Sequence, residues 1–139
     1  MSLEKDYLTA TRWLNQAIDD FGSGEVLLQA QKFPQACFLF QQAAEKAIKA
    51  VWYFYSEEPW GHSVVRLIEL IPEPWAREQF LPLMQEAKGL DEFYIPTRYP
   101  NGLPAPLIAK DVYTGDRARW AREACLKIIN KTKEVIGGC

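Results

Sequence analysis

The side chains best suited to chemistry in this sequence gather along one side of a single predicted helix. Winding residues 40–52, FQQAAEKAIKAVW, at about 100° per residue places five polar side chains on one strip, opposite a broad apolar face. This polar strip consists of Gln41, Gln42, Glu45, Lys46 and Lys49. Its amides and ammonium groups suit a phosphate-bearing ligand, and Trp52 and Tyr53 flank it as stacking surfaces. The strip is either the only solvated side of a central helix, with Glu45 and Lys49 as an ordinary i, i+4 ion pair, or the wall of a binding site.

A second group of candidates lies in the proline-rich segment 94–115, YIPTRYPNGLPAPLIAKDVYTG. Each proline fixes a backbone angle, so the segment should be stiff and should hold Arg98 and Tyr99 in a restricted geometry. The planar fork of Arg98 suits phosphate or carboxylate, and we expect it to close over the polar strip. The alternative is a structural arginine that ties the segment to a helix end or to Asp20. Tyr99 and Tyr113 are either site residues or loop anchors with buried rings.

The single histidine and a pair of aspartates complete the candidates. His62 follows a Trp-Gly turn just before a predicted helix, a position typical of a capping or local hydrogen-bonding residue. Asp19 and Asp20 are adjacent and point about 100° apart on a helix, so only Asp20 is an accessory candidate, with a solvated carboxylate as the alternative. The sequence shows no metal-ligand cluster, glycine-rich phosphate loop or Ser/His/Asp arrangement. We therefore predict no catalytic residue, metal site or cofactor.

The elements that must position these residues are all helical. Apolar residues recur at steps of three and four through segments 6–30, 34–54, 75–93 and 114–137, and Ser63 can cap a short helix that runs through Ile71. Gly22 and Gly24 either mark a close approach by a neighbouring backbone within one helix or break that helix. No long stretch alternates at period two. The prediction is an all-α fold, an antiparallel helix bundle of four longer helices plus one short helix, in a single domain over 1–139.

Composition narrows the class of protein further. A net charge of −2 argues against a general polyanion binder. The three cysteines, Cys37, Cys125 and Cys139, lack the spacing of a zinc site or disulfide framework. No stretch approaches the roughly 20 apolar residues that span a bilayer, and the first residues lack a signal-peptide core, so we expect a cytoplasmic protein that does not enter a membrane.

Five stretches in order resemble a known family, the HEPN domains: WLNQAIDD, KFPQACFLFQQAAEKAIKA, GHSVVRLIEL, LDEFYIPTRYP and DVYTGDRARWAREACLKII. The resemblance covers nearly the whole chain, and QQAAEKAIKA and TRYP are its most specific parts. It implies an all-α bundle that forms a homodimer. It also implies one of two roles: partnership with a minimal nucleotidyltransferase encoded beside it, or activity as a ribonuclease of toxin–antitoxin or defence systems. The catalytic motif of those ribonucleases is an arginine followed, after four to six residues, by a histidine.

The sequence departs from that ribonuclease motif. The permitted positions after Arg98 hold Leu103, Pro104 and Ala105, none of which exchanges protons near neutral pH as histidine does. The resemblance thus favours nucleotide or RNA binding together with a minimal nucleotidyltransferase partner. A ribonuclease with a non-standard site and a purely structural dimerisation module stay open. The predicted ligand-binding residues are Gln42, Glu45, Lys46, Lys49, Arg98 and Tyr99, with Asp20, His62 and Tyr113 as accessories.

Overall fold

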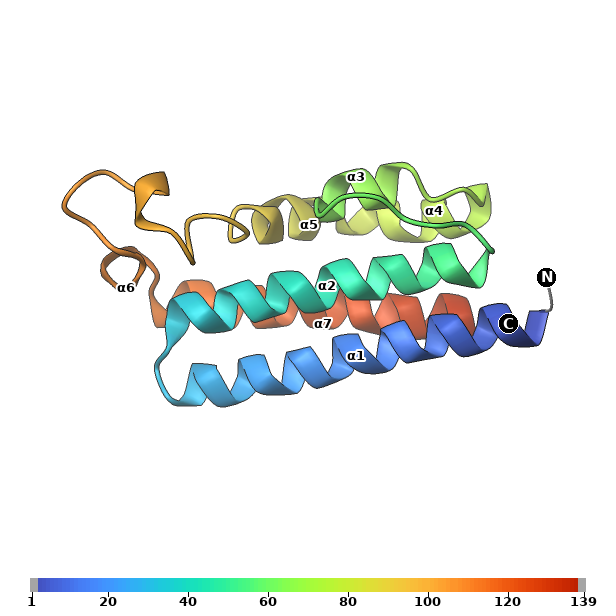
Figure 1. Ribbon diagram of the computed structural model, residues 1–139, viewed down its shortest axis with the longest axis horizontal. Helices are drawn as coiled ribbons and strands as arrows, with labels where there is room; N and C mark the ends of the chain where they lie inside the picture. Colours follow the sequence, from blue (N-terminus) through green and yellow to red (C-terminus); the bar gives the residue numbers. More distant parts are fainter. Residues whose placement is uncertain (1–2, 138–139) are drawn as a thin grey trace.

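The computed structural model describes residues 3–137, and every regular element in that range is a helix. Three long helices lie side by side: the first runs antiparallel to the second, whereas the second and the third, which shorter helices separate along the chain, run parallel to each other (Figure 1). They are α1 (Leu3–Gln29), α2 (Phe33–Phe54) and α7 (Gly115–Gly137). Shorter helices form a second layer over α2: α3 (Val64–Glu69), α4 (Pro74–Phe80) and α5 (Met84–Asp91). The predicted all-α bundle is confirmed.

Helix α2 lies at the centre of the bundle because its apolar face is wide and its side chains there are small. Ala43, Ala44, Ala47 and Ala50 are all fully buried, so α1 and α7 can approach the backbone of α2 closely. Around these alanines the larger core side chains, such as Phe40, fill the space between helices. The polar strip lies on the side of α2 away from this apolar core.

Helix α1 is continuous through both of its internal glycines. A Cβ atom added at Gly24 would lie 2.6 Å from Cε1 of Phe40, so α2 packs at this point closer than any side chain allows. A Cβ atom at Gly22 would meet nothing within 4 Å. A close approach therefore exists at Gly24 and not at Gly22, and it is made by the side chain of Phe40, whereas a neighbouring backbone was predicted.

The segment predicted as one helix over 75–93 is interrupted. Helix α4 ends at Phe80, a short 3₁₀ turn covers Leu81–Leu83, and α5 begins at Met84. Pro82 is the physical reason, since proline has no N–H to donate within a helix and its ring collides with the preceding turn. The apolar period continues across Pro82, so the sequence pattern predicts one helix where the structure has two.

Helix ends follow the capping chemistry in the sequence. The side chain of Ser63 accepts a hydrogen bond from the backbone N–H of Arg66 at 3.1 Å, which caps α3. The hydroxyl of Thr114 accepts from the N–H of Arg117 at 3.3 Å before α7. Asp91 adds support at α3 that the sequence did not reveal, accepting from the N–H of Val64 at 2.7 Å and of Val65 at 3.0 Å.

The proline-rich segment has more local structure than its sequence predicts. It contains a 3₁₀ turn at Pro100–Gly102 and the short helix α6 (Ala109–Val112), and it forms the end of the molecule farthest from both termini (Figure 1). Backbone bonds close further turns, as from Arg98 N–H to the carbonyl of Ile95 at 3.0 Å. Within residues 3–137, no helix combines the length and the apolar character needed to cross a bilayer.

Candidate functional site

The polar strip of α2 is a hydrogen-bonded network that other elements largely cover. Glu45 is only 3% exposed, and its Oε2 lies 2.9 Å from Nζ of Lys49. Gln42 donates to Oε1 of Gln41 at 2.8 Å and to Oε1 of Glu45 at 3.3 Å. Because the Glu45 carboxylate is withdrawn from solvent, the pair with Lys49 is not the ordinary solvated ion pair that its spacing allows.

His62 joins the strip from the turn before α3. Its carbonyl accepts a hydrogen bond from Nε2 of the buried Gln41 at 3.1 Å, and its Nδ1 lies 3.4 Å from Oε2 of Glu45. The imidazole also stacks on the ring of Tyr94, with centroids 5.1 Å apart. More than half of the His62 side chain is exposed, at 59%. The accessory candidate His62 and the predicted strip residue Glu45 are therefore neighbours.

Asp20 reaches the strip from α1. Its Oδ2 lies 2.5 Å from Nζ of Lys46, and its Oδ1 accepts from Nε2 of Gln16 at 3.0 Å. The Asp20 side chain is 13% exposed, so the carboxylate is paired and not simply solvated. Sequence reasoning thus selected two members of one ion pair, Asp20 and Lys46, from two different helices.

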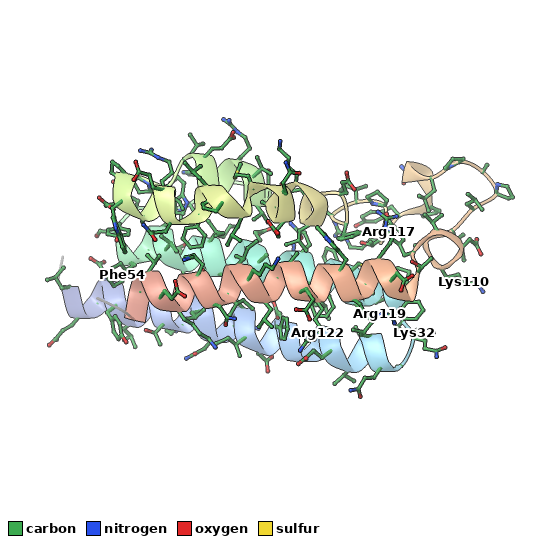
Figure 2. The ribbon with its side chains drawn as sticks, turned by 180° about the vertical axis from the view of Figure 1, so that it is seen from behind. Lys32, Phe54, Lys110, Arg117, Arg119 and Arg122 are labelled. Carbon is green, nitrogen blue, oxygen red and sulfur yellow. The ribbon has the colours of Figure 1, made fainter. Side chains whose placement is uncertain are left out.

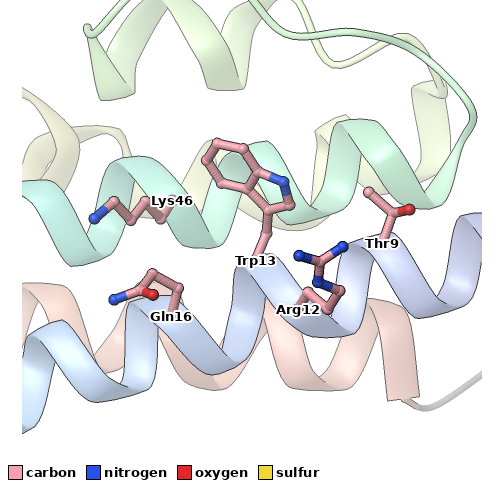
Figure 3. A pocket seen from close by; sticks show the side chains of 5 residues that line it. All are labelled: Thr9, Arg12, Trp13, Gln16 and Lys46. Carbon is pink, nitrogen blue, oxygen red and sulfur yellow. The ribbon is translucent and has the colours of Figure 1, made fainter.

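A cavity of about 450 Å³ opens between α1 and α2 beside this ion pair (Figure 3). We call it the α1–α2 groove; it is lined by Thr9, Arg12, Trp13, Gln16 and Lys46. The indole of Trp13 stacks on the ring of Tyr53 with centroids 5.2 Å apart, and Nζ of Lys49 lies 5.9 Å from the Trp13 centroid. The arrangement offers a flat aromatic surface with three cationic side chains around it.

Sequence reasoning missed the contribution of α1 to this groove. Residues 9, 12, 13 and 16 recur at steps of three and one, which places them on one face of a helix, and Asp20 continues that face. That spacing was the available signal in the sequence. It was overlooked because most of these residues are polar and lie beside the stronger apolar stripe of the same helix. Trp52 was also misplaced: its Nε1 donates to the carbonyl of Leu67 at 3.0 Å under α3, so it does not offer a stacking surface beside the strip, whereas Tyr53 does.

Arg98 lies at the end of the strip and not over its lysines. Its guanidinium carbon is 4.4 Å from the ring centroid of Phe38, 4.7 Å from that of Tyr94 and 5.0 Å from that of Tyr99. Its Nε donates to the carbonyl of Tyr94 at 2.9 Å. Phe38 precedes Lys46 by eight residues, a rise of about 12 Å along α2. The predicted closure over the strip is corrected: cation–π contacts and the tight turns of the segment hold Arg98 one helical turn before Gln42.

Tyr113 is not brought to the strip. Its ring is 5% exposed and meets Phe93 edge to face at 5.8 Å, with the guanidinium of Arg117 at 4.7 Å. Burial raises the pKa of the Tyr113 hydroxyl above its ordinary value, and the charge of Arg117 opposes that rise. Tyr113 is therefore a loop anchor, whereas Tyr99 is half exposed beside Arg98.

The helical bundle is the fold expected of the HEPN domains that the sequence resembles. The family model described as HEPN domain matches residues 10–138. The chain belongs to the HEPN family.

Individual relatives agree with this assignment. The chain is 35% identical to the Thermus thermophilus protein TT1696, whose crystal structure superposes with a TM-score of 0.82 over 91% of this chain and 97% of that one. The archaeal HEPN homologue ST0689 is 31% identical, with a TM-score of 0.73 over the same shares of the two chains, 91% and 97%. A Methanocaldococcus jannaschii protein named "Putative toxin MJ1304" is 29% identical over 137 residues, covering 91% of this chain and 85% of its own length.

Proposed function

We propose that this HEPN protein binds a nucleotide or RNA in the α1–α2 groove. The observation that carries the proposal is the Trp13 indole, stacked on Tyr53 and surrounded by the cations of Arg12, Lys46 and Lys49. A base can stack on an indole face for roughly 1–3 kcal/mol, while cationic groups at its edge bind the phosphates.

The charges around the groove favour an anion. Lys46 is paired with Asp20 and Lys49 with Glu45, so each of these lysines is largely neutralised. Arg12 is exposed and forms no ion pair with any carboxylate of residues 3–137, which leaves the groove with a net positive charge. Gln16, which lines the groove, adds an amide that donates one N–H to Asp20 and can donate the other to a base or a phosphate.

We further propose a toxin-like role in which a minimal nucleotidyltransferase is the partner. The toxin-like part is supported by the name of the M. jannaschii relative, which is 29% identical over 91% of this chain. The nucleotidyltransferase is inferred from the family resemblance alone. A nucleotide-binding groove is compatible with such a partner, because both proteins would then act on the same class of ligand.

Replacing Arg12 tests the groove. We expect Arg12→Ala to weaken binding of ATP or a short oligoribonucleotide by about tenfold or more, equivalent to about 1.4 kcal/mol, because one charged hydrogen-bonding group is lost. Isothermal titration calorimetry measures the affinity and a thermal melt checks the fold. Lys88→Ala, which also removes one exposed positive charge but lies on α5, is the matched control. Equal affinities for wild type and Arg12→Ala would refute binding in the groove.

A ribonuclease with a non-standard site is the second candidate, because the fold places His62 and Arg98 against the same ring of Tyr94. The buried Glu45 holds the imidazole through Nδ1, an arrangement that suits proton transfer. We nevertheless expect binding without cleavage, since the Arg98 guanidinium lies against aromatic rings and the family spacing is absent. Incubation of the purified protein with RNA in EDTA checks this. Cleavage that disappears in His62→Ala would establish the second candidate instead.

A further inference from the structure

A second cavity lies between the α1–α2 turn and the proline-rich segment. Its volume is about 350 Å³, and we call it the basic pocket. It is lined by Gln31, Lys32, Pro34, Gln35, Arg98 and Tyr99, with residues 100 and 108–110 completing it. The two sides come from parts of the chain more than sixty residues apart, and only the fold brings them together. Apart from Arg98 and Tyr99, none of its lining residues stands out in the sequence.

Three positive charges surround the basic pocket without a compensating carboxylate. They belong to Lys32, Arg98 and Lys110, and none of the three forms an ion pair within the described range 3–137. The adjacent Asp111 is engaged elsewhere, because its Oδ2 accepts the backbone N–H of Ile108 at 2.9 Å. Like charges held this close repel one another, and an anion between them removes the repulsion.

Other groups around the pocket suit the same kind of ligand. Gln31 and Gln35 provide neutral donors from one side of the pocket and Tyr99, which is half exposed, from the other. The side chain of Lys32, the residue that precedes α2, makes no capping hydrogen bond. Lys32 and Lys110 both project at the end of the bundle that carries α6 (Figure 2). The Arg98 guanidinium is pre-ordered over Phe38 and Tyr94, so little side-chain entropy is lost when it binds.

We propose that the basic pocket binds ligands that carry two or more linked phosphates, through Lys32, Arg98 and Lys110. The inference rests on the proposed function for the class of ligand, although its residues differ from those of the α1–α2 groove. Three cations match the charge of a nucleoside polyphosphate or of consecutive phosphodiesters better than that of one phosphate. Because Phe38, on which Arg98 packs, precedes Lys46 by eight residues, a rise of about 12 Å along α2, an RNA strand could reach both sites, whereas a triphosphate alone would occupy the basic pocket.

The first experiment uses inorganic tripolyphosphate as the probe, measured by isothermal titration calorimetry on the full chain. The variant Lys32→Gln with Lys110→Gln removes two charges and keeps a polar side chain only one atom shorter at each position. The matched control, Lys88→Gln with Lys133→Gln, makes the same charge change at exposed positions on α5 and near the other end of α7. We expect the first pair to weaken binding at least tenfold and the control pair less than twofold. Both side chains of the first pair are exposed, so melting temperatures should stay within a few degrees.

The same variants then distinguish the source of the phosphates. A loss of affinity for ATP identifies a terminal polyphosphate, and a loss of affinity for oligouridylate without a terminal phosphate identifies an RNA backbone; either supports the site. If Arg12→Ala weakens nucleotide binding while the Lys32 and Lys110 changes do not, the result supports binding in the α1–α2 groove and refutes binding in the basic pocket. If the Lys32 and Lys110 changes weaken nucleotide binding while Arg12→Ala does not, the result supports the basic pocket and refutes the groove. Tripolyphosphate that does not bind, or that binds both double variants equally, overturns the inference.

Discussion

Glu45 is the residue on which the chemistry of the strip depends. A carboxylate with 3% exposure is costly to bury unless it is paired, and here Lys49 and Gln42 supply the pairing from the same helix while His62 supplies it from another element. The network explains why polar residues persist on the side of α2 that faces α1 and the turn before α3. It also leaves the imidazole edge of His62 open to solvent, beside Tyr94 and within reach of the end of the strip.

Cys37 offers a test of burial by pH. Burial raises the pKa of its thiol from 9.0 to about 12, although the nearby charge of Arg117 acts to lower it. Above pH 9 the unfolded chain therefore ionises this thiol while the folded chain does not. The resulting stabilisation is fully present below pH 9 and is lost as pH rises toward 12, by about 1.4 kcal/mol per unit.

The Cys37→Ala variant isolates this contribution from all other titrating groups. We expect it to be less stable than wild type at pH 8 and to approach or exceed wild type at pH 10.5, because alanine has no thiol to ionise. Urea denaturation of both proteins at the two pH values measures the difference. A difference in unfolding free energy that stays constant with pH would show that the thiol is not withdrawn from solvent.

At the scale of elements, the contact between α1 and α2 is tight at Gly24. An added Cβ there would lie 2.6 Å from the fully buried ring of Phe40. A ring fixed inside the core cannot move aside without disturbing its neighbours. We expect Gly24→Ala to destabilise the fold by about 1–3 kcal/mol, as overpacking typically does.

Gly22→Ala is the matched control in the same helix, two residues away. A Cβ at Gly22 meets nothing within 4 Å, and alanine favours the helix over glycine by about 0.8–1 kcal/mol. The two substitutions are therefore expected to change stability in opposite directions in chemical denaturation. Equal effects would mean that helix propensity alone governs this part of α1 and that the close approach has no energetic weight.

For the whole molecule, we predict a homodimer from the distribution of tryptophans. Trp60 is 83% exposed, Trp75 50% and Trp120 43%, while Trp13 and Trp52 pack against the core. Large aromatic side chains left at the surface of so small a protein are typical of subunit contacts. We expect a dimer at tens of micromolar in sedimentation equilibrium. Native mass spectrometry of protein purified gently from its own cells reports the subunit count together with any retained nucleotide and any co-purifying nucleotidyltransferase. A monomer in both sedimentation and mass spectrometry would contradict the dimer.

The sequence by itself determined the helices and the family. Apolar periods of three and four, together with Ser63 and Thr114 as caps, placed the long helices, and the stretches QQAAEKAIKA and TRYP were enough to indicate a HEPN domain. These features are local, because helix formation and capping depend on residues a few positions apart. Pro82 is an equally local signal and marks the interrupted helix, but the apolar period that continues across it points to a single helix.

Only the tertiary structure decided which polar side chains meet. Asp20 with Lys46, His62 with Glu45 and Arg98 with Phe38 join parts of the chain far apart in sequence. Sequence spacing carries no information on such pairs, since they depend on how the helices are rotated against one another and where the turns end. For the same reason the strip was predicted and the α1 side of the groove was not. Arg98, which was expected to cover the lysines, instead packs on Phe38, which precedes Lys46 and Lys49 on α2 by eight and eleven residues, a rise of about 12 Å and about 16 Å.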